Sequence, residues 1–316
     1  MLQPGHPAIL PPPRHSAGQA PERPWVPIWL AEQAAIMESE LERRLPTASP
    51  GALHRPMRHA VLGGGKRLRP LLVLATARAV AGSREAALRA ACAVELIHAY
   101  SLVHDDMPCM DNDVLRRGQP TTHVAFGEGM ALLAGDALQT LAFEILTQDD
   151  GRVGLDVQAR MCAVLARAAG YWGMAGGQAI DITSTSLKLD GAQLRDMHRR
   201  KTGALIRASV MLGAASGPAD ADTREALAAY AEAIGLAFQI VDDILDATQT
   251  ATVLGKTAGK DAATGKATYV TMLGLDGAKA CADEQHRAAL EALDRSGLAD
   301  TRALAWLADM ISARRS

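Results

Sequence analysis

The sequence predicts an all-α protein built as a single large helical bundle. Aromatic residues make up only 3% of its 316 residues, and the alternation of β-branched and polar residues that marks strands is nearly absent. Alanine is abundant, and residues that begin or end helices recur, among them Pro70, Asp136 and Gly203. We therefore expect roughly ten to twelve helices packed around one core.

The expected helices follow one another with short turns rich in Gly, Asp and Ser between them. The segment that leads into Asp105 is largely apolar, which predicts a buried helix. No linker-like composition divides residues 28–316, and no repeat of fixed period occurs. The expected helical ranges are 28–46, 51–63, 66–81, 84–107, 130–148, 154–180, 190–215, 221–247, 276–296 and 298–314.

Residues 1–27 differ from the rest of the chain. They are rich in Pro, with Gly and Ala between, and we expect them to form a disordered arm in front of one domain over residues 28–316. The arm lacks the basic start and continuous apolar segment of a signal peptide. No run of about 18 uncharged apolar residues occurs, so no membrane span is expected.

The overall composition excludes some classes of function. Apolar residues make up 48%, charged residues 22%, and the net charge is −2, so the basic footprint of a nucleic-acid-binding protein is missing. Four cysteines are widely spaced and form no CxxC motif. This spacing argues against a disulfide framework or a zinc site, and predicts a reducing compartment, which we expect to be the cytoplasm.

One acidic cluster follows the buried helix. Asp105, Asp106, Asp111 and Asp113 fall within nine positions, and Pro108 separates the first pair from the second. Positions six apart do not share a face of a straight helix. Because proline disfavours helix at the residue before it, we expect a loop that swings Asp111 back towards Asp105.

A second acidic cluster lies in the sequence VDDILD. Asp242 and Asp246 are four apart and share one face of a helix, with Asp243 beside them. Acidic turns are often only solvated loops, but like charges on an apolar helix are costly unless a counter-charge is present. Carboxylates without His or Cys suit Mg²⁺, which binds few carboxylates together with waters and substrate phosphates.

Three other sites are excluded. The acidic loop has no Gly at its sixth and no Glu at its twelfth position, so it is not an EF-hand. The ExxH from Glu95 to His98 has no second copy, which a di-iron bundle requires. The GGGKRL sequence lacks the GxxxxGK[ST] pattern of a phosphate-binding Walker A loop.

Basic residues occur in four separate patches. Each patch alone is more typical of a solvated face, but four of them with two acidic clusters suggest two diphosphates, one bridged by metal and one bound by Arg and Lys. The patches are Lys66, Arg67 and Arg69; Arg116 and Arg117; Lys201, beside the Thr202 hydroxyl; and Lys256, Lys260 and Lys266.

With these motifs in this order, the sequence resembles the trans (E-type) isoprenyl diphosphate synthases, in particular the bacterial farnesyl diphosphate synthases. The resemblance covers about residue 28 to the C-terminus and implies the isoprenoid synthase fold, a helical bundle around a central cavity. The motifs that carry it are GGGKRLRP, ELIHAYSLVHDDMPCMD, LRRGQPTTH, AGDALQTLAFEIL, GGQAID, KTGALIRAS, GLAFQIVDDILD and GKATY.

The resemblance implies a role for each motif. Mg²⁺, expected as about three ions, would be held with the allylic diphosphate by Asp105, Asp106, Asp111, Asp242, Asp243 and Asp246. Isopentenyl diphosphate would be bound by Lys66, Arg69, His98 and Arg117, with Gly65 letting the backbone approach. The allylic diphosphate would contact Arg116, Lys201, Lys256 and Lys266, while Thr202 and Gln239 would stabilise the carbocation.

The length of the product depends on the residues before Asp105. In the family such a residue floors the prenyl pocket, and the candidates are Tyr100 and Ser101. Five helical residues rise about 7.5 Å, a depth that could stop a prenyl chain after two or three isoprene units. A large ring at Tyr100 favours the C15 product, although DDMPCMDND is also similar to C20 synthases.

Other activities are kept as alternatives. The resemblance favours dimethylallyltranstransferase and geranyltranstransferase activity in a homodimer, and a C20 or C10 synthase is the runner-up. A non-catalytic partner subunit is less favoured because both aspartate motifs are complete. A terpene cyclase is also less favoured, since it would not need the GGGKRLRP motif. Asp113 has no assigned role beyond the turn.

Overall fold

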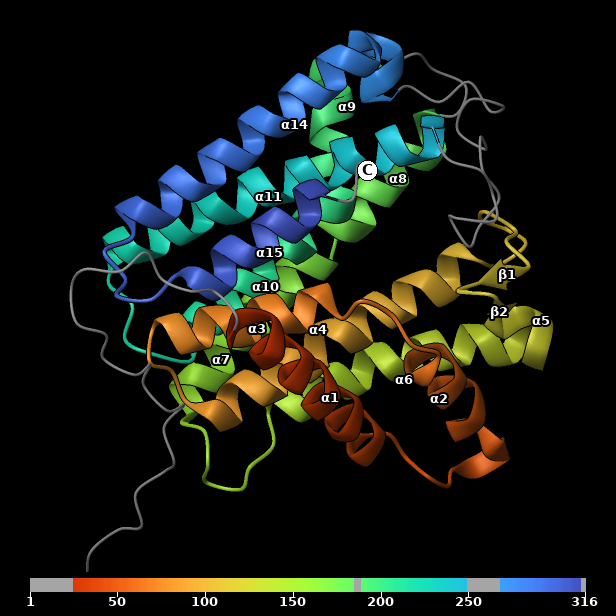
Figure 1. The fold of residues 1–316 in the computed structure, drawn as a ribbon. Coiled ribbons are helices and arrows are strands. Elements are labelled where there is room, and N and C mark those ends of the chain that lie inside the picture. The colour runs from red at the N-terminus through yellow and green to blue at the C-terminus, as the bar shows by residue number, and fades with distance from the viewer. Residues whose placement is uncertain (1–24, 185–188, 249–267, 314–316) are drawn as a thin grey trace, which may run out of the picture.

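The computed structural model describes residues 25–184, 189–248 and 268–313. Within these ranges the protein is helical apart from one hairpin of two-residue strands, which confirms the all-α class (Figure 1). Up to the hairpin the elements are α1 (Trp25–Arg44), η1 (Pro50–Ala52), α2 (His54–Leu62), α3 (Leu68–Ala79), α4 (Arg84–Asp105), β1 (Leu115–Arg116) and β2 (Gln119–Pro120). After it come α5 (Thr122–Phe126), α6 (Glu128–Leu146), α7 (Leu155–Ala169), α8 (Met174–Ser184), α9 (Gly191–His198), η2 (Arg199–Gly203), α10 (Ala204–Ala215), α11 (Ala221–Thr248), α14 (Tyr269–Arg295) and α15 (Arg302–Ala313).

The first helix begins at Trp25, earlier than predicted. Val26 is completely buried, and the Trp25 ring lies edge-on to Trp29 with 6.4 Å between ring centroids. The guanidinium of Arg78 lies over the Trp25 ring at 4.8 Å. These contacts place the last three residues of the predicted arm inside the helical domain, and residues 1–24 lie outside the described ranges.

α4 is the central helix of one half of the bundle. Fourteen of its 22 residues are buried, and it packs against α3, α6 and α10. Its many alanines let these neighbours approach closely, and large side chains such as Leu138 and Leu165 fill the remaining space. Burial of each such side chain contributes about 2 kcal/mol. The predicted burial of this helix is confirmed.

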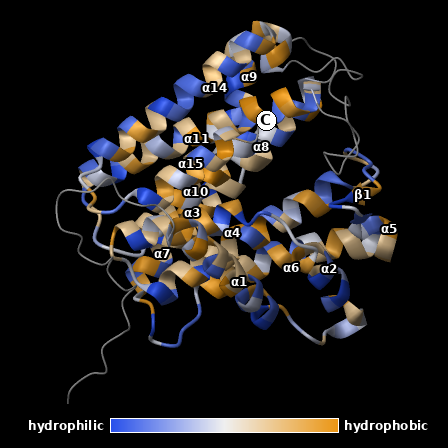
Figure 2. Cartoon of the chain, in the orientation of Figure 1, coloured by the Kyte–Doolittle hydropathy of each residue, from blue (hydrophilic) through white to orange (hydrophobic). Residues whose placement is uncertain are grey.

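A second apolar cluster joins α3, α10, α11, α14 and α15. Tyr230 is fully buried there, and its hydroxyl donates a hydrogen bond to the Leu304 carbonyl at 2.8 Å. Figure 2 shows apolar residues gathered along the inward faces of these helices and of α4. The two clusters together hold the long helices α4 and α11 in place.

Two helices of the described ranges are long and apolar enough to span a membrane, namely α4 and α6. The apolar window of α4 is 83% buried within the protein, as expected of a core helix. The window of α6 is only 39% buried, and Leu132 and Leu133 are 47% and 52% exposed. α6 therefore carries an apolar stripe at the surface.

Several predicted helices differ from the observed ones. The predicted helix 154–180 is two helices, α7 and α8, because the chain turns between Gly170 and Gly173, where a Cβ at Gly173 would clash with the Ala168 carbonyl. The predicted helix 190–215 contains the π-helical turn η2. α14 begins at Tyr269 and is kinked at Gly274, where φ is 72°.

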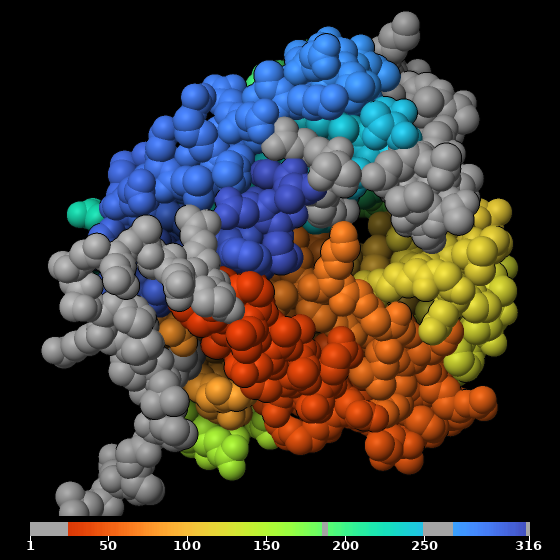
Figure 3. Space-filling model, viewed as in Figure 1, coloured from red at the N-terminus to blue at the C-terminus, as the bar shows by residue number. Residues whose placement is uncertain are grey.

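The C-terminal ends of α4 and α11 lie on the same side of the bundle (Figure 1). The hairpin of β1 and β2 follows the end of α4, and α8 packs against η2, which in turn packs against α11. In Figure 3 the hairpin region in yellow and the end of α11 in cyan lie on the same side of the molecule. Both aspartate clusters therefore lie at one end of the molecule.

Candidate active site

The first aspartate loop, residues 105–113, folds back on the end of α4. α4 ends at Asp105, before Pro108, and the Asp111 N–H donates to the Asp105 carbonyl at 2.9 Å. The Asn112 N–H closes a second turn on the Met107 carbonyl at 3.1 Å. The predicted loop, which brings Asp111 back to Asp105, is confirmed.

Asp106 and Arg116 form a paired unit. Asp106 is 4% exposed, and its Oδ1 and Oδ2 accept hydrogen bonds from Arg116 Nε at 2.9 and 3.0 Å. Arg116 Nη2 also lies 3.4 Å from Asp113 Oδ2. Asp113 thus contributes to the charge balance of the loop, while the metal role of Asp106 and the diphosphate contact of Arg116 stay predictions.

Asp105 lies partly buried at the end of α4. Burial raises the pKa of Asp105 to about 6, the charge of Lys201 opposes this rise, and Asp111 adds to it. A carboxylate in this setting is destabilised as an anion and gains from a nearby cation. Asp105 and the exposed Asp111 therefore form the open part of the first aspartate loop.

Lys201 and Thr202 lie on the π-helical turn η2. A π turn widens the helix locally and is frequent at functional sites. Lys201 Nζ donates to Asp181 Oδ2 of α8 at 2.6 Å. Burial acts to lower the pKa of Lys201, but Asp181 and then Asp105 outweigh it, so this pKa is raised and the ammonium stays charged.

α8 supplies residues whose roles the sequence did not reveal. A Cβ at Gly177 would clash with the backbone of Lys201, so this glycine lets α8 lie directly against η2. Asp181 is 8% exposed and holds Lys201, and the buried Oε1 of Gln178 has no hydrogen-bond partner among the described residues. Gly177, Gln178 and Asp181 all belong to the GGQAID motif. An acid within this otherwise apolar segment was the sequence signal that could have identified Asp181 as a site residue.

The second aspartate cluster lies near the end of α11. Asp242 and Asp246 are half-buried and one helical turn apart, whereas Asp243 is 5% exposed. Gln239 Nε2 donates to Asp243 Oδ1 at 2.9 Å, and Thr202 Oγ1 donates to Gln239 Oε1 at 3.2 Å. The structure thus brings Thr202, Gln239 and Asp243 together, although the motifs are distant in sequence.

A separate cavity of about 140 Å³ gathers the cations predicted to bind the second diphosphate. Its lining includes Lys66, Arg69, His98 and Arg117. Arg69 Nε is buried without a hydrogen-bond partner among the described residues. Burial, followed by the charges of Arg69 and Arg117, lowers the pKa of His98 well below its usual range, so the imidazole is neutral. These groups can receive a polyanion.

The glycine turn of this cavity is held in position by Arg67 and Arg117. Arg67 has a left-handed backbone with φ of 48°, and its buried guanidinium pairs with Glu38 at 2.6 Å and Glu95 at 2.7 Å. Arg117 donates to the Gly64 carbonyl, and a Cβ at Gly65 would lie 2.8 Å from the Arg117 guanidinium carbon. Arg67 is therefore an anchor of the turn, and the backbone that approaches Arg117 requires Gly65.

Tyr100 and Ser101 lie one turn before Asp105. The half-buried Tyr100 ring packs edge-on against His104 with 5.7 Å between centroids, and it contacts the apolar cluster around α4. Burial raises the pKa of Tyr100, and the charge of Asp105 adds to this, so ring and carboxylate are near each other. The Ser101 hydroxyl donates to the His98 carbonyl at 2.8 Å. Tyr100 is thus the bulkier of the two side chains at this depth.

The structure does not describe all of the predicted site residues, and the described carboxylates do not by themselves form a complete metal site. Lys256 and Lys266 lie outside the described residues. Within residues 25–184, 189–248 and 268–313, no three or more His, Cys, Asp or Glu side chains converge as a ready metal site. The exposed and half-buried aspartates nevertheless fit Mg²⁺, which takes few protein carboxylates and completes its shell with water and substrate phosphate.

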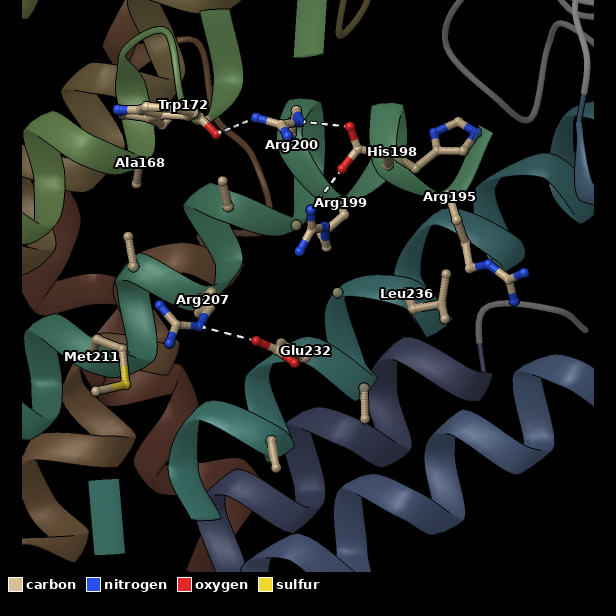
Figure 4. Close-up of a pocket in the computed structure, with 18 of the residues that line it drawn as sticks. Ala168, Trp172, Arg195, His198, Arg199, Arg200, Arg207, Met211, Glu232 and Leu236 are labelled. Carbon is tan, nitrogen blue, oxygen red and sulfur yellow. Dashed lines mark hydrogen bonds and ion pairs between the residues drawn. The ribbon is translucent and has the colours of Figure 1, made fainter. Parts of the chain in front are cut away.

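A larger groove of about 1100 Å³ is lined by residues of α7, α9, η2, α10 and α11 (Figure 4). None of the predicted site residues within the described ranges lines it. Asp196 accepts hydrogen bonds from Arg199 at 2.6 Å and Arg200 at 2.7 Å, and Arg200 also donates to the Trp172 carbonyl at 3.1 Å. These bonds brace η2, the turn that also carries Lys201.

Comparisons of the sequence with known proteins identify its relatives. A model of the polyprenyl synthetase family matches residues 50–309. The chain is 44% identical over 288 residues to the farnesyl diphosphate synthase of Geobacillus stearothermophilus, covering 90% of this chain and 97% of that protein. It is also 44% identical over 270 residues to geranylgeranyl pyrophosphate synthase 9 of Arabidopsis thaliana, covering 84% and 75%.

A solved structure extends the comparison to the fold. The geranyltransferase from Helicobacter pylori, complexed with magnesium and isoprenyl diphosphate, aligns with a TM-score of 0.82 at 32% identity, over 92% of this chain and 99% of that one. The resemblance found in the sequence is confirmed. The chain belongs to the polyprenyl synthetase family.

Proposed function

We propose that the protein condenses isopentenyl diphosphate with dimethylallyl or geranyl diphosphate to give (2E,6E)-farnesyl diphosphate. The observation that carries the proposal is the presence of two distinct sets of diphosphate-binding groups. One set combines open carboxylates with Lys201, and the other is the cation-lined cavity of Arg69 and His98. An enzyme that joins two diphosphate substrates needs two such sites.

The proposed reaction is an ionisation followed by an addition. The C–O bond of the allylic diphosphate breaks, and both electrons leave with the diphosphate. The double bond of isopentenyl diphosphate then attacks the allylic carbon, and loss of one proton to the departed diphosphate restores a double bond. No protein nucleophile is required, which fits the site as built.

The first aspartate loop and α11 receive the allylic diphosphate in this proposal. Asp105, Asp111, Asp242 and Asp246 would hold Mg²⁺, and Lys201 adds a fixed positive charge beside them. The proposal is supported by the H. pylori relative, which was solved with magnesium and isoprenyl diphosphate. Mg²⁺, expected as about three ions, supplies neutralisation of the leaving diphosphate when bound.

Isopentenyl diphosphate is assigned to the cavity of Lys66, Arg69, His98 and Arg117. The buried Arg69 Nε, which has no acceptor within the described part of the chain, supports this assignment because such a donor is costly without an acceptor. A neutral His98 can donate one ring N–H to a phosphate oxygen. Binding of the polyanion would raise the pKa of His98 from its lowered state.

The C15 product rests on Tyr100. Its ring, packed on His104, lies one turn before Asp105, where a chain growing from the diphosphate would descend. A C20 product is the runner-up, since a farnesyl and a geranylgeranyl synthase are each 44% identical to the chain. A C10 product is less favoured.

We also propose a homodimer, which works in the cytoplasm. The exposed apolar stripe of α6, with Leu132 and Leu133 at 47% and 52% exposure, is the surface that we assign to the contact. Exposed apolar residues that lie together on a protein surface are typical of an interaction site. All four cysteines are free, as expected in a reducing compartment.

The direct test is incubation of the purified protein with Mg²⁺, isopentenyl diphosphate and each allylic starter in turn, followed by sizing of the products. We expect C15 from dimethylallyl and geranyl starters. A C20 product would refute the Tyr100 assignment, and no product from any starter would refute the synthase. Asp242→Ala should lower turnover by orders of magnitude, whereas Asp113→Ala should act far less.

A further inference from the structure

We propose that Asp243 is a positioning residue and not a metal ligand. Asp243 orients the side-chain amide of Gln239, and through it the hydroxyl of Thr202. Asp243 also joins the first turn of α14 to the turn of α11 that contains Gln239 and Asp243. The proposal rests on the proposed function for its kinetic consequences, but its structural part can be tested without any activity.

The two oxygens of Asp243 are both used inside the protein. Oδ1 accepts a hydrogen bond from Gln239 Nε2 at 2.9 Å, and Oδ2 accepts one from the Tyr269 backbone N–H at 2.8 Å. Asp243 is only 5% exposed, while Asp242 and Asp246 of the same cluster are half-buried. A buried carboxylate whose two oxygens both accept hydrogen bonds within the protein is poorly placed to bind a metal ion.

The hydrogen bonds of this group can run in only one direction. An ionised carboxylate accepts and cannot donate, so the NH₂ of Gln239 must face Asp243. The amide oxygen of Gln239 must then face the Thr202 hydroxyl, which donates its proton to it at 3.2 Å. The lone pairs of the Thr202 oxygen are left for other partners. Asp243 therefore fixes an amide orientation that would otherwise be free to flip.

This orientation has a consequence for catalysis. With Asp243 ionised, oxygen atoms and not N–H groups lie between η2 and α11, and oxygen dipoles stabilise a developing carbocation. If the Gln239 amide flipped, its NH₂ would replace the oxygen and oppose the positive charge. Asp243 acts on the reaction through Gln239 and Thr202, with no need to touch the substrate.

The second bond anchors α14. Tyr269 is the first residue of this helix, so its N–H has no acceptor within the helix. The Asp243 carboxylate supplies one, and a negative charge is favourable at this end of a helix. The Tyr269 side chain is 6% exposed and packs in the cluster of Ile240 and Ile244. One carboxylate thus joins the end of α11 to the start of α14.

The test compares Asp243→Asn with Asp242→Asn. The asparagine offers one oxygen and one NH₂, so it cannot accept from both Gln239 and Tyr269. We expect Asp243→Asn to lower kcat by about tenfold to a hundredfold, while the half-saturating Mg²⁺ concentration stays within about twofold of wild type. Asp242→Asn should instead raise the Mg²⁺ requirement by about tenfold or more.

Hydrogen exchange measured by mass spectrometry gives a readout independent of turnover. A peptide that contains Tyr269 and begins several residues before it should exchange faster in Asp243→Asn and remain unchanged in Asp242→Asn. Unchanged exchange at this peptide, or a Mg²⁺ shift in Asp243→Asn that matches that of Asp242→Asn, would overturn the proposal. A wild-type protein that makes no product would refute the proposed function and leave the exchange result standing.

A third variant, Gln239→Leu, tests the same proposal even if Asp243→Asn does not fold. It removes the amide but keeps the bond between Asp243 and Tyr269. We expect a comparable fall in kcat with the Tyr269 peptide still protected, and a double variant with kcat no lower than about that of the worse single variant. Unchanged kcat in Gln239→Leu, or losses that multiply in the double variant, would overturn the role assigned to Asp243.

Discussion

Lys201 Nζ lies 2.6 Å from Asp181 Oδ2, and this pair joins η2 to α8. The two side chains are 25% and 11% exposed, so the pair is largely shielded from water. The carboxylates of Asp105 and Asp111 also act on Lys201 and favour its charged form. Asp181 therefore holds the ammonium beside the first aspartate loop.

Asp181→Asn should destabilise the protein, because Lys201 would lose its charged partner while remaining partly buried. Loss of a hydrogen bond to a charged group lowers the free energy of unfolding by about 1.5–3 kcal/mol. Urea unfolding of the variant measures this loss. In a double-mutant cycle, Lys201→Met should cost less stability in the Asp181→Asn background than in wild type, because the ion pair is already lost; equal costs would contradict the pairing.

The stability of the protein without metal should depend on Asp105. Its folded pKa of about 6 lies above the unfolded value of 3.8, so the folded state favours the protonated carboxyl. The resulting contribution of Asp105 to the free energy of unfolding is fully present below about pH 3.8 and is lost as the pH rises through about 6. Asp105→Asn should therefore unfold at higher urea than wild type at pH 8 and at a similar urea concentration near pH 4. A pH-independent difference would contradict the raised pKa.

Tyr100→Ala should lengthen the product. The truncation removes the ring that packs on His104 and opens depth along α4 below Asp105. We expect C20 or longer products from geranyl diphosphate, detected by chromatography of the dephosphorylated alcohols. Ser101→Ala is the matched control, because its hydroxyl is bonded to the His98 carbonyl and adds little volume. Unchanged C15 output from Tyr100→Ala would place the floor elsewhere.

Gly177→Ala should lower both stability and turnover. The added methyl group would clash with the Lys201 backbone, so α8 and η2 must separate. Overpacking of this kind costs about 1–3 kcal/mol. Gly129→Ala is the control, since a Cβ there meets nothing within 4 Å. Thermal melting and steady-state assays compare the two, and a wild-type-like Gly177→Ala would refute the close contact.

Much of the fold followed from local patterns. The apolar segment before Asp105 predicted the buried α4, and Pro108 predicted both the end of that helix and the returning loop. These features depend on backbone sterics within a few residues. The break between α7 and α8 was missed because it depends on a close approach at Gly173, which no periodicity reveals.

The candidate site was predicted in its residue types but not in its pairings. The motifs identified Asp106 and Arg116, yet only the three-dimensional structure shows that they bind each other. In the same way Asp243 could not be distinguished from Asp242 by sequence, because its partner Tyr269 lies 26 residues away. A sequence pattern does not reveal such long-range hydrogen bonds.

The hairpin between β1 and β2 links the two proposed substrate sites mechanically. Arg117 and Gly118 both have positive φ, 53° and 75°, which gives a tight reversal matched to the twist of the strands. As a result Arg116 holds the end of α4 through Asp106, while Arg117 reaches the Gly64 turn. Adjacent α-carbons are about 3.8 Å apart. Two consecutive residues of one tight turn thus contact both proposed substrate sites, so a change in the turn would act on both.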